Sequence, residues 1–92
     1  MIISFVHKGL ERFFKTGDTR GIQAKHAQRL SKILFYLNHA QTHNEINQPG
    51  YDLHQLHPKN AALYAMKVSG NWRVTFRFIN GNAEIVDYLD YH

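Results

Sequence analysis

The spacing of apolar residues changes along the chain, from a helical period in the first half to alternation in the second. Residues 24–40 have apolar positions at the period of an α-helix, which predicts the longest helix and turns its apolar stripe toward a core. A shorter helix is predicted over residues 8–17, which end at a glycine suited to a helix C-terminus. The stripe of the longer helix consists of Ala27, Leu30, Ile33, Leu34 and Leu37.

Strand-forming residues occupy the start of the chain and its last third. β-branched and aromatic residues at 1–6 predict a first strand, and alternating segments at 64–68, 71–79 and 83–89 predict an antiparallel meander. A short extra strand is also expected at 51–54. The predicted fold is a single α+β domain over residues 1–92 with the order β-α-α-β-β-β. Its two N-terminal helices pack on one face of a mostly antiparallel sheet.

The pairing of the last two strands follows from the turn between them. The Asn-Gly dipeptide at 80–81 predicts a type I′ hairpin turn, and such a turn fixes the register. Counting back from a two-residue loop places Arg77 opposite Glu84 and Arg73 opposite Tyr88. A regular ladder therefore assigns every side chain of these strands to one face.

Alternation then predicts a polar face that the helices leave open. Asp90 becomes the diagonal neighbour of Arg73, Lys67 lies opposite Arg73, and His92 joins them if the strand continues. Tyr91 points toward the core in this arrangement. The predicted core face comprises Trp72, Val74, Phe76, Phe78, Ala83, Ile85 and Leu89, with Asp87 as an unexplained polar member.

Composition narrows the class of protein. The chain has 92 residues, a formal net charge of +4 and no cysteine, which excludes disulfides and thiolate metal sites. No apolar run approaches the roughly 20 residues that a membrane span needs, and the N-terminus has no signal-peptide pattern, so a cytoplasmic protein is expected. The positive charge favours a polyanionic partner. Lys25, Arg29 and Lys32 share a helix face, which fits either a solvated surface or a basic stripe that docks on RNA.

The seven histidines do not predict a metal site. His54 and His57 are spaced i, i+3, but no other ligand pair is placed to complete a closed site. His7, His26, His39 and His43 are scattered, and most are expected at the surface. No cofactor is predicted.

Metal-free cleavage of RNA suits the residue types of the open face. The reaction needs a base for the ribose 2′-hydroxyl, an acid for the leaving 5′-oxygen and a cation for the phosphate. Histidine has a pKa near neutrality, and arginine binds phosphate through paired hydrogen bonds. A tyrosine can stack on a base or donate to a phosphate oxygen. The arginine strand and the terminal residues together supply all of these groups, although a plain solvated face with cross-strand ion pairs is equally compatible.

Three segments of the chain resemble one family. The stretches SFVHKGLERFFKTG at 4–17, YDLHQL at 51–56 and VSGNWRVTFRFINGNAEIVDYLDYH at 68–92 are similar to HigB toxins of bacterial toxin–antitoxin pairs, within the RelE/ParE superfamily. The resemblance implies a metal-independent endoribonuclease that cuts mRNA in the ribosomal A site. It also implies a helix-turn-helix antitoxin as partner, and products with a cyclic phosphate and a 5′-hydroxyl.

The resemblance also implies the site residues, one position at a time. The catalytic set carried over is His54, Arg73, Asp90, Tyr91 and His92. An ungapped alignment selects His54, whereas an alignment on the following proline selects His57. The residues expected to bind RNA are Lys67, Arg77, His57 and Lys59.

Other functions fit the same fold. The chain would then be a non-catalytic module that binds RNA or the ribosome, a ParE-like inhibitor of DNA gyrase, or a decayed toxin that still binds its antitoxin. Only cleavage leaves new 5′-hydroxyl ends on translated mRNA.

Overall fold

Four helical segments form one layer of the domain. The structure is a computed structural model that describes residues 1–58 and 61–91. The helices are α1 (Lys8–Thr16), the 3₁₀ helix η1 (Ala24–His26), α2 (Ala27–His39) and the short α3 (His43–Ile46). His7 caps α1, because its Nδ1 accepts the Leu10 N–H at 2.9 Å. The two predicted helices are confirmed, and α3 is an addition within the expected loop.

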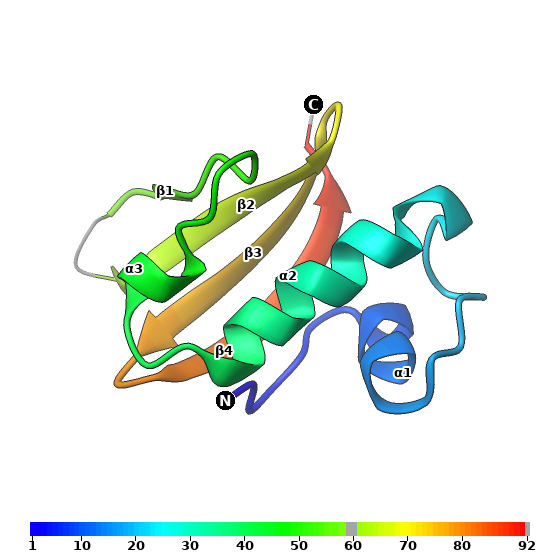
Figure 1. Cartoon of the computed structure of the whole chain (residues 1–92), viewed down its shortest axis with the longest axis horizontal. Helices are drawn as coiled ribbons and strands as arrows, with labels where there is room; N and C mark the ends of the chain where they lie inside the picture. The colour runs from blue at the N-terminus through cyan, green and yellow to red at the C-terminus, as the bar shows by residue number, and fades with distance from the viewer. Residues whose placement is uncertain (59–60, 92) are drawn as a thin grey trace.

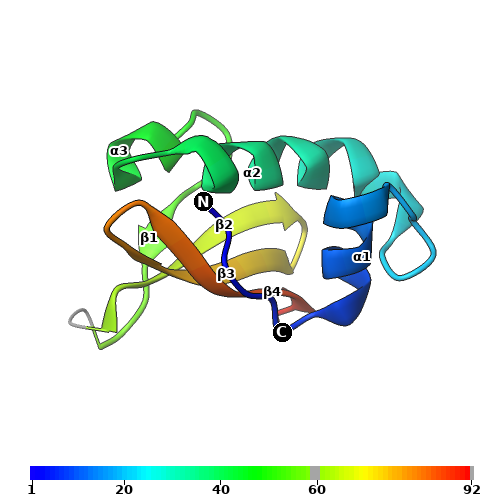
Figure 2. The same cartoon turned by 90° about the horizontal axis from the view of Figure 1, so that it is seen from below.

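The second layer is an antiparallel sheet. Its strands are β1 (His54–Gln55), β2 (Leu63–Ser69), β3 (Trp72–Ile79) and β4 (Asn82–Asp90), hydrogen-bonded in chain order. Figures 1 and 2 show the helices on one face of this sheet only. The predicted α+β class and antiparallel meander are confirmed, with the short extra strand at 54–55 instead of 51–54.

A β-bulge interrupts the pairing of β3 with β4. The predicted register holds from the turn as far as Arg77 opposite Glu84, but the next aligned pair is Thr75 opposite Asp87. One extra residue therefore lies on β4, where Ile85 has a positive φ of 49°. Such a residue is left out of the ladder and reverses the alternation beyond it.

The bulge corrects the predicted faces of β4. Arg73 lies opposite Leu89 and not Tyr88, while Asp90 lies opposite Trp72 on the helix-covered side. Tyr88 is buried, with 3% of its surface exposed, whereas Ile85 is exposed. Five assignments on β4 were thus wrong, because the prediction assumed a regular ladder: Tyr88 and Asp90 on the open face, and Ile85, Asp87 and Leu89 on the core face.

The N-terminal segment lies beside β4, but it is not a regular strand. Instead of the predicted strand at 1–6, it makes two isolated parallel bridges, at Ile2 and Phe5. Between them the N–H of the bulged Ile85 donates to Ser4 Oγ at 2.7 Å. The bulge breaks the backbone ladder at that point and so explains the difference.

The core lies between the helices and the sheet. The stripe of α2 is buried as predicted, except that Ala27 is only partly covered. It packs with side chains from α1 and the three long strands: Leu10, Met66, Val68, Val74, Phe76, Phe78, Ala83 and Val86. Within the described ranges 1–58 and 61–91, no helix is long and apolar enough to cross a membrane.

Candidate functional site

The face of the sheet opposite the helices holds the predicted cationic residues. Figure 2 shows the helices of the described chain on the other face of the sheet. Val74 and Phe76 of β3 are buried under the helices, while the alternating Arg73, Thr75 and Arg77 are only partly buried. We call this surface the open face, and the prediction that helices leave it free is confirmed.

Lys67 and Arg73 form a pair of cations across β2 and β3. Their Cα atoms are direct partners in the sheet, as predicted. Arg73 Nη1 donates to the carbonyls of Gly70 at 2.7 Å and Trp72 at 3.0 Å. No carboxylate forms a salt bridge with either cation in the part of the chain that the structure describes. Like charges directly opposite in a sheet repel each other, so this pair is suited to an anion.

Arg29 fixes the backbone beneath Lys67. Its guanidinium donates to the Lys67 carbonyl through Nε at 3.2 Å and Nη2 at 3.0 Å, and Nη2 also donates to the Gly50 carbonyl. The guanidinium carbon lies 4.1 Å from the centre of the Tyr51 ring, a cation–π contact. The possible basic stripe on α2 therefore loses its middle member, since Arg29 ties α2 to β2.

His54 reaches the open face from the edge strand β1. It is paired with Ala65 of β2, and Ala65 is paired with Thr75 of β3, so these residues form one row. The spacing of adjacent strands puts β1 about 10 Å from β3. His54 Nδ1 lies 3.1 Å from the Asp52 carbonyl oxygen, which can only accept a hydrogen bond. Nδ1 is therefore the donor of this hydrogen bond, and in the neutral imidazole this tautomer leaves on Nε2 the lone pair that a general base needs.

The C-terminal end of β4 runs beside the turn between β2 and β3 (Figure 1). The Tyr91 N–H donates to the Asn71 carbonyl at 2.7 Å, and half of the Tyr91 surface is exposed. Because of the bulge, alternation puts Tyr91 on the side of Arg73, opposite to the predicted orientation. Asp90 is exposed on the other side, so the expected neighbourhood of Asp90 and Arg73 is wrong.

The remaining predicted site residues are Arg77, His57, Lys59 and His92. Arg77 Nη1 lies 3.1 Å from Glu84 Oε1, so this cation is already paired within the sheet. His57 is exposed after β1. Lys59 and His92 lie outside the described residues. Within the described segments, no cluster of three or more His, Asp or Glu side chains is arranged to hold a metal ion.

A buried polar cluster anchors β4, and the sequence reasoning did not find it. His26 is 3% exposed, and its Nδ1 lies 2.7 Å from the Tyr88 hydroxyl oxygen. The Trp72 ring stacks on Tyr88 with 4.6 Å between ring centres, and the Gln23 N–H donates to the hydroxyl at 3.4 Å. The prediction that most of the scattered histidines lie at the surface does not hold for His26. The sequence does carry a signal of its burial, because His26 lies one turn before Leu30 and so in line with the apolar stripe.

The same cluster shifts two pKa values. Burial lowers the pKa of His26, and the charge of Lys25 adds to this effect. Burial raises the pKa of Tyr88, although the Gln23 hydrogen bond opposes the shift. Both groups are therefore neutral at pH 7. They hold β4 two residues before Asp90 and so position the C-terminal end.

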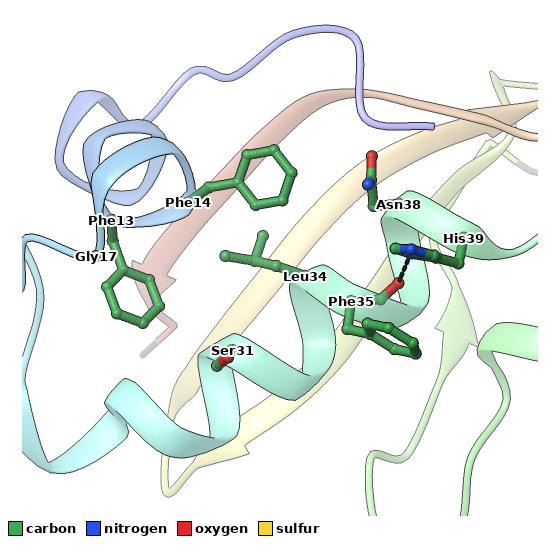
Figure 3. Close-up of a pocket in the computed structure, with 8 residues that line it drawn as sticks. All are labelled: Phe13, Phe14, Gly17, Ser31, Leu34, Phe35, Asn38 and His39. Carbon is green, nitrogen blue, oxygen red and sulfur yellow. Dashed lines mark hydrogen bonds between the residues drawn. The ribbon is translucent and has the colours of Figure 1, made fainter.

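A separate apolar groove lies on the helix side, between α1 and α2 (Figure 3). Its volume is about 370 Å³, and Phe35 at its edge is 58% exposed. His39 stacks on Phe35 and donates from Nδ1 to its carbonyl at 3.1 Å. None of the described members of the predicted catalytic set lines this groove. Its lining residues are Phe13, Phe14, Gly17, Ser31, Leu34, Phe35, Asn38 and His39.

The comparisons with known proteins agree with the fold and identify the family. Residues 3–92 match the model of a family described as the RelE-like toxin HigB of type II toxin–antitoxin systems. The chain belongs to this HigB-like toxin family. It is also 41% identical to a Proteus vulgaris protein named endoribonuclease HigB, over 92 residues that cover both chains completely. The family predicted from the sequence is thus confirmed, and a HigB-like toxin is one half of a toxin–antitoxin pair.

Proposed function

We propose that this HigB-like protein is an endoribonuclease toxin that cuts mRNA in the ribosomal A site. The name of the Proteus vulgaris relative and the family match support the cleavage activity. The observation that carries the proposal is the Lys67–Arg73 pair on the open face, with Tyr91 on the same side and His54 two strands away. A phosphodiester satisfies both cations and brings the ribose within reach of groups that transfer protons.

The proposed reaction needs only side chains. His54 Nε2 takes the proton of the 2′-hydroxyl, the 2′-oxygen forms a bond to phosphorus, and the bond from phosphorus to the 5′-oxygen breaks. The leaving 5′-oxygen takes a proton from a side chain at the C-terminal end of the chain. Tyr91 and His92 are the candidate proton donors. Arg73 donates to the non-bridging oxygens as their charge increases. The products are a 2′,3′-cyclic phosphate and a 5′-hydroxyl.

Asp90 has a different proposed position from the one that the sequence suggested. It lies on the opposite side of β4 from Tyr91 and Arg73. We therefore propose that Asp90 orients the residues at the C-terminal end of the chain and not the Arg73 guanidinium. Asp90 and His92 remain proposed members of the catalytic set, and Lys59 and His57 remain proposed contacts to RNA.

The proposed partners follow from the family and from the reaction. A type II toxin implies an antitoxin, and we propose that it is a helix-turn-helix protein. Cleavage in the A site requires the ribosome and mRNA, and hence action in the cytoplasm. Arg77 contributes less to RNA binding than Lys67, because Glu84 already neutralises it.

The test is cleavage of a translated mRNA, mapped by primer extension with chemistry that identifies 5′-hydroxyl ends. Wild-type protein should produce new ends only when the mRNA is translated. Arg73→Ala should reduce the rate about 100- to 1000-fold, as expected for a lost donor to a developing oxyanion. His54→Ala should reduce it about 100-fold or more. Arg12→Ala, an exposed α1 change of equal charge, should cut like wild type.

The competing functions give different results in this assay. A non-catalytic module arrests ribosomes without new 5′-hydroxyl ends, and a gyrase inhibitor leaves mRNA intact. Either result with wild-type protein would refute cleavage. Normal cleavage by a folded Arg73→Ala variant would refute the proposed phosphate site.

A further inference from the structure

A second recess lies beside His54, between α3 and the strands β1 and β2. Its volume is about 290 Å³. It is lined by His43, Asn47, Leu53, His54, Gln55 and Tyr64. We call it the α3 pocket. His54 belongs both to this pocket and to the open face, so RNA held at the proposed cleavage site passes its rim.

Three aromatic rings form a ladder from the core to the α3 pocket. Phe76 is buried, and the Tyr64 ring lies nearly parallel to it, with 5.9 Å between ring centres. The His43 ring is nearly parallel to Tyr64, with 6.1 Å between centres, and His43 is exposed. Exposed aromatic rings of this kind are the feature on which proteins stack unpaired bases, and here the exposed ring is that of His43.

Polar groups beside the rings can bind the edge of a base. Asn47 brings a side-chain amide that has no hydrogen-bond partner within residues 1–58 and 61–91. Among the residues that the structure describes, no carboxylate lines the α3 pocket. Glu45, the acid of α3, accepts hydrogen bonds from Gln41 N–H and the Thr42 hydroxyl instead. The pocket therefore offers stacking and amide contacts without repelling a phosphate backbone.

We propose that the α3 pocket binds one nucleobase of the mRNA, next to the cleaved linkage, and so contributes to codon preference. The base stacks on the His43–Tyr64 rings, and the Asn47 amide reads its edge. This inference depends on the proposed function, because it assigns a substrate contact to the same site. It predicts that His43 and Asn47 change which codons are cut without taking part in the chemical step.

The experiment uses ribosomes programmed with short defined mRNAs and measures cleavage in a single turnover. Each mRNA carries one abasic nucleotide, moved one position at a time around the cleavage site. With wild-type protein, one abasic position should lower the rate about tenfold or more, as expected for a lost base stack. His43→Ala should cause a loss of similar size on intact mRNA. It should cause no further loss at that one position, because both changes remove the same contact.

His39→Ala is the matched control. His39 is also an exposed histidine stacked on an aromatic ring, but it lies in the α1–α2 groove. This variant should keep wild-type rates and codon distribution. Circular dichroism and thermal unfolding of His43→Ala and Asn47→Ala would show that the fold is retained.

The outcomes separate the two proposals. If wild-type protein does not cut, the proposed function fails and this inference fails with it. If wild-type protein and His39→Ala cut, but His43→Ala and Asn47→Ala cut the same codons at unchanged rates, only the inference is overturned. Losses from His43→Ala that multiply with the abasic loss at every position would also overturn it, because they would show a general effect on the site.

Discussion

Replacing Tyr88 by Phe tests how the polar cluster holds β4 against the start of α2. The hydroxyl accepts from the Gln23 N–H at 3.4 Å, so its own hydrogen is free to donate to His26 Nδ1 at 2.7 Å. His26 Nε2 is buried and has no hydrogen-bond partner in the described structure. The Phe variant keeps the ring and its stacking on Trp72. It removes the hydrogen bond on which the buried imidazole depends.

The expected cost follows from leaving buried polar groups unsatisfied. A buried acceptor that loses its partner costs about 1–3 kcal/mol, and a value of about 2 kcal/mol suits one neutral acceptor. For a domain of this size, each kcal/mol shifts the melting temperature by about 4–8 °C, so the midpoint should fall by about 8–16 °C. Tyr91→Phe removes an exposed hydroxyl and should change stability by no more than about 0.5 kcal/mol.

Urea unfolding of Tyr88→Phe, His26→Phe and the double variant measures the coupling. The double variant replaces both partners by rings of similar shape, which destabilises a protein much less than removing only one partner. Its loss of unfolding free energy should therefore be smaller than the sum of the two single losses. Additive losses, or a loss below about 0.5 kcal/mol in Tyr88→Phe with an unchanged slope against urea, would refute the hydrogen bond as a stabilising contact.

The same histidine predicts a pH dependence. Because burial and the charge of Lys25 lower its pKa in the folded state, the unfolded chain binds more protons than the native protein at mildly acidic pH. The unfolding free energy is therefore full above about pH 6.5, the unfolded value, and decreases as pH falls toward the lower native value. His26→Phe should flatten this slope between pH 7 and 5. An equal slope in both proteins would show that His26 is not the group responsible.

Two further changes test contacts away from this cluster. Gly21→Ala should destabilise the fold by about 1–3 kcal/mol in urea unfolding. The added Cβ would lie 2.5 Å from the Gly9 Cα and would push α1 away from the loop that follows it. An unchanged unfolding midpoint would contradict this contact. Arg29→Ala should lower the free energy of unfolding by about 1–2 kcal/mol, because it removes the contacts to the Lys67 carbonyl and the stacking on Tyr51. Arg29→Lys should recover only part of this loss, because a lysine lacks the forked guanidinium that reaches two carbonyls.

The sequence predicted the parts of the fold that depend on local periodicity. The helices, the three long strands and the register next to the turn at 80–81 all follow from short-range patterns. The bulge could not be predicted in this way, because Ile85 fits either face of a strand and its N–H bonds to Ser4, which is distant in the sequence. The pairing of Lys67 with Arg73 was predicted correctly, because β2 and β3 pair without a break from Leu63 opposite Arg77 to Lys67 opposite Arg73.

The bulge also explains how one backbone irregularity decides which groups meet at the site. Without the extra residue, Tyr88 would lie on the open face and Tyr91 would point toward the helices. With it, Tyr88 enters the polar cluster, while Tyr91 takes the side of Arg73. Burial of Tyr88 therefore favours the shifted register over the regular one, since the regular register would expose that ring and bury Asp87. The stability of the cluster and the composition of the proposed catalytic face are thus two consequences of the same local choice, and a change that removes the bulge should disturb both together.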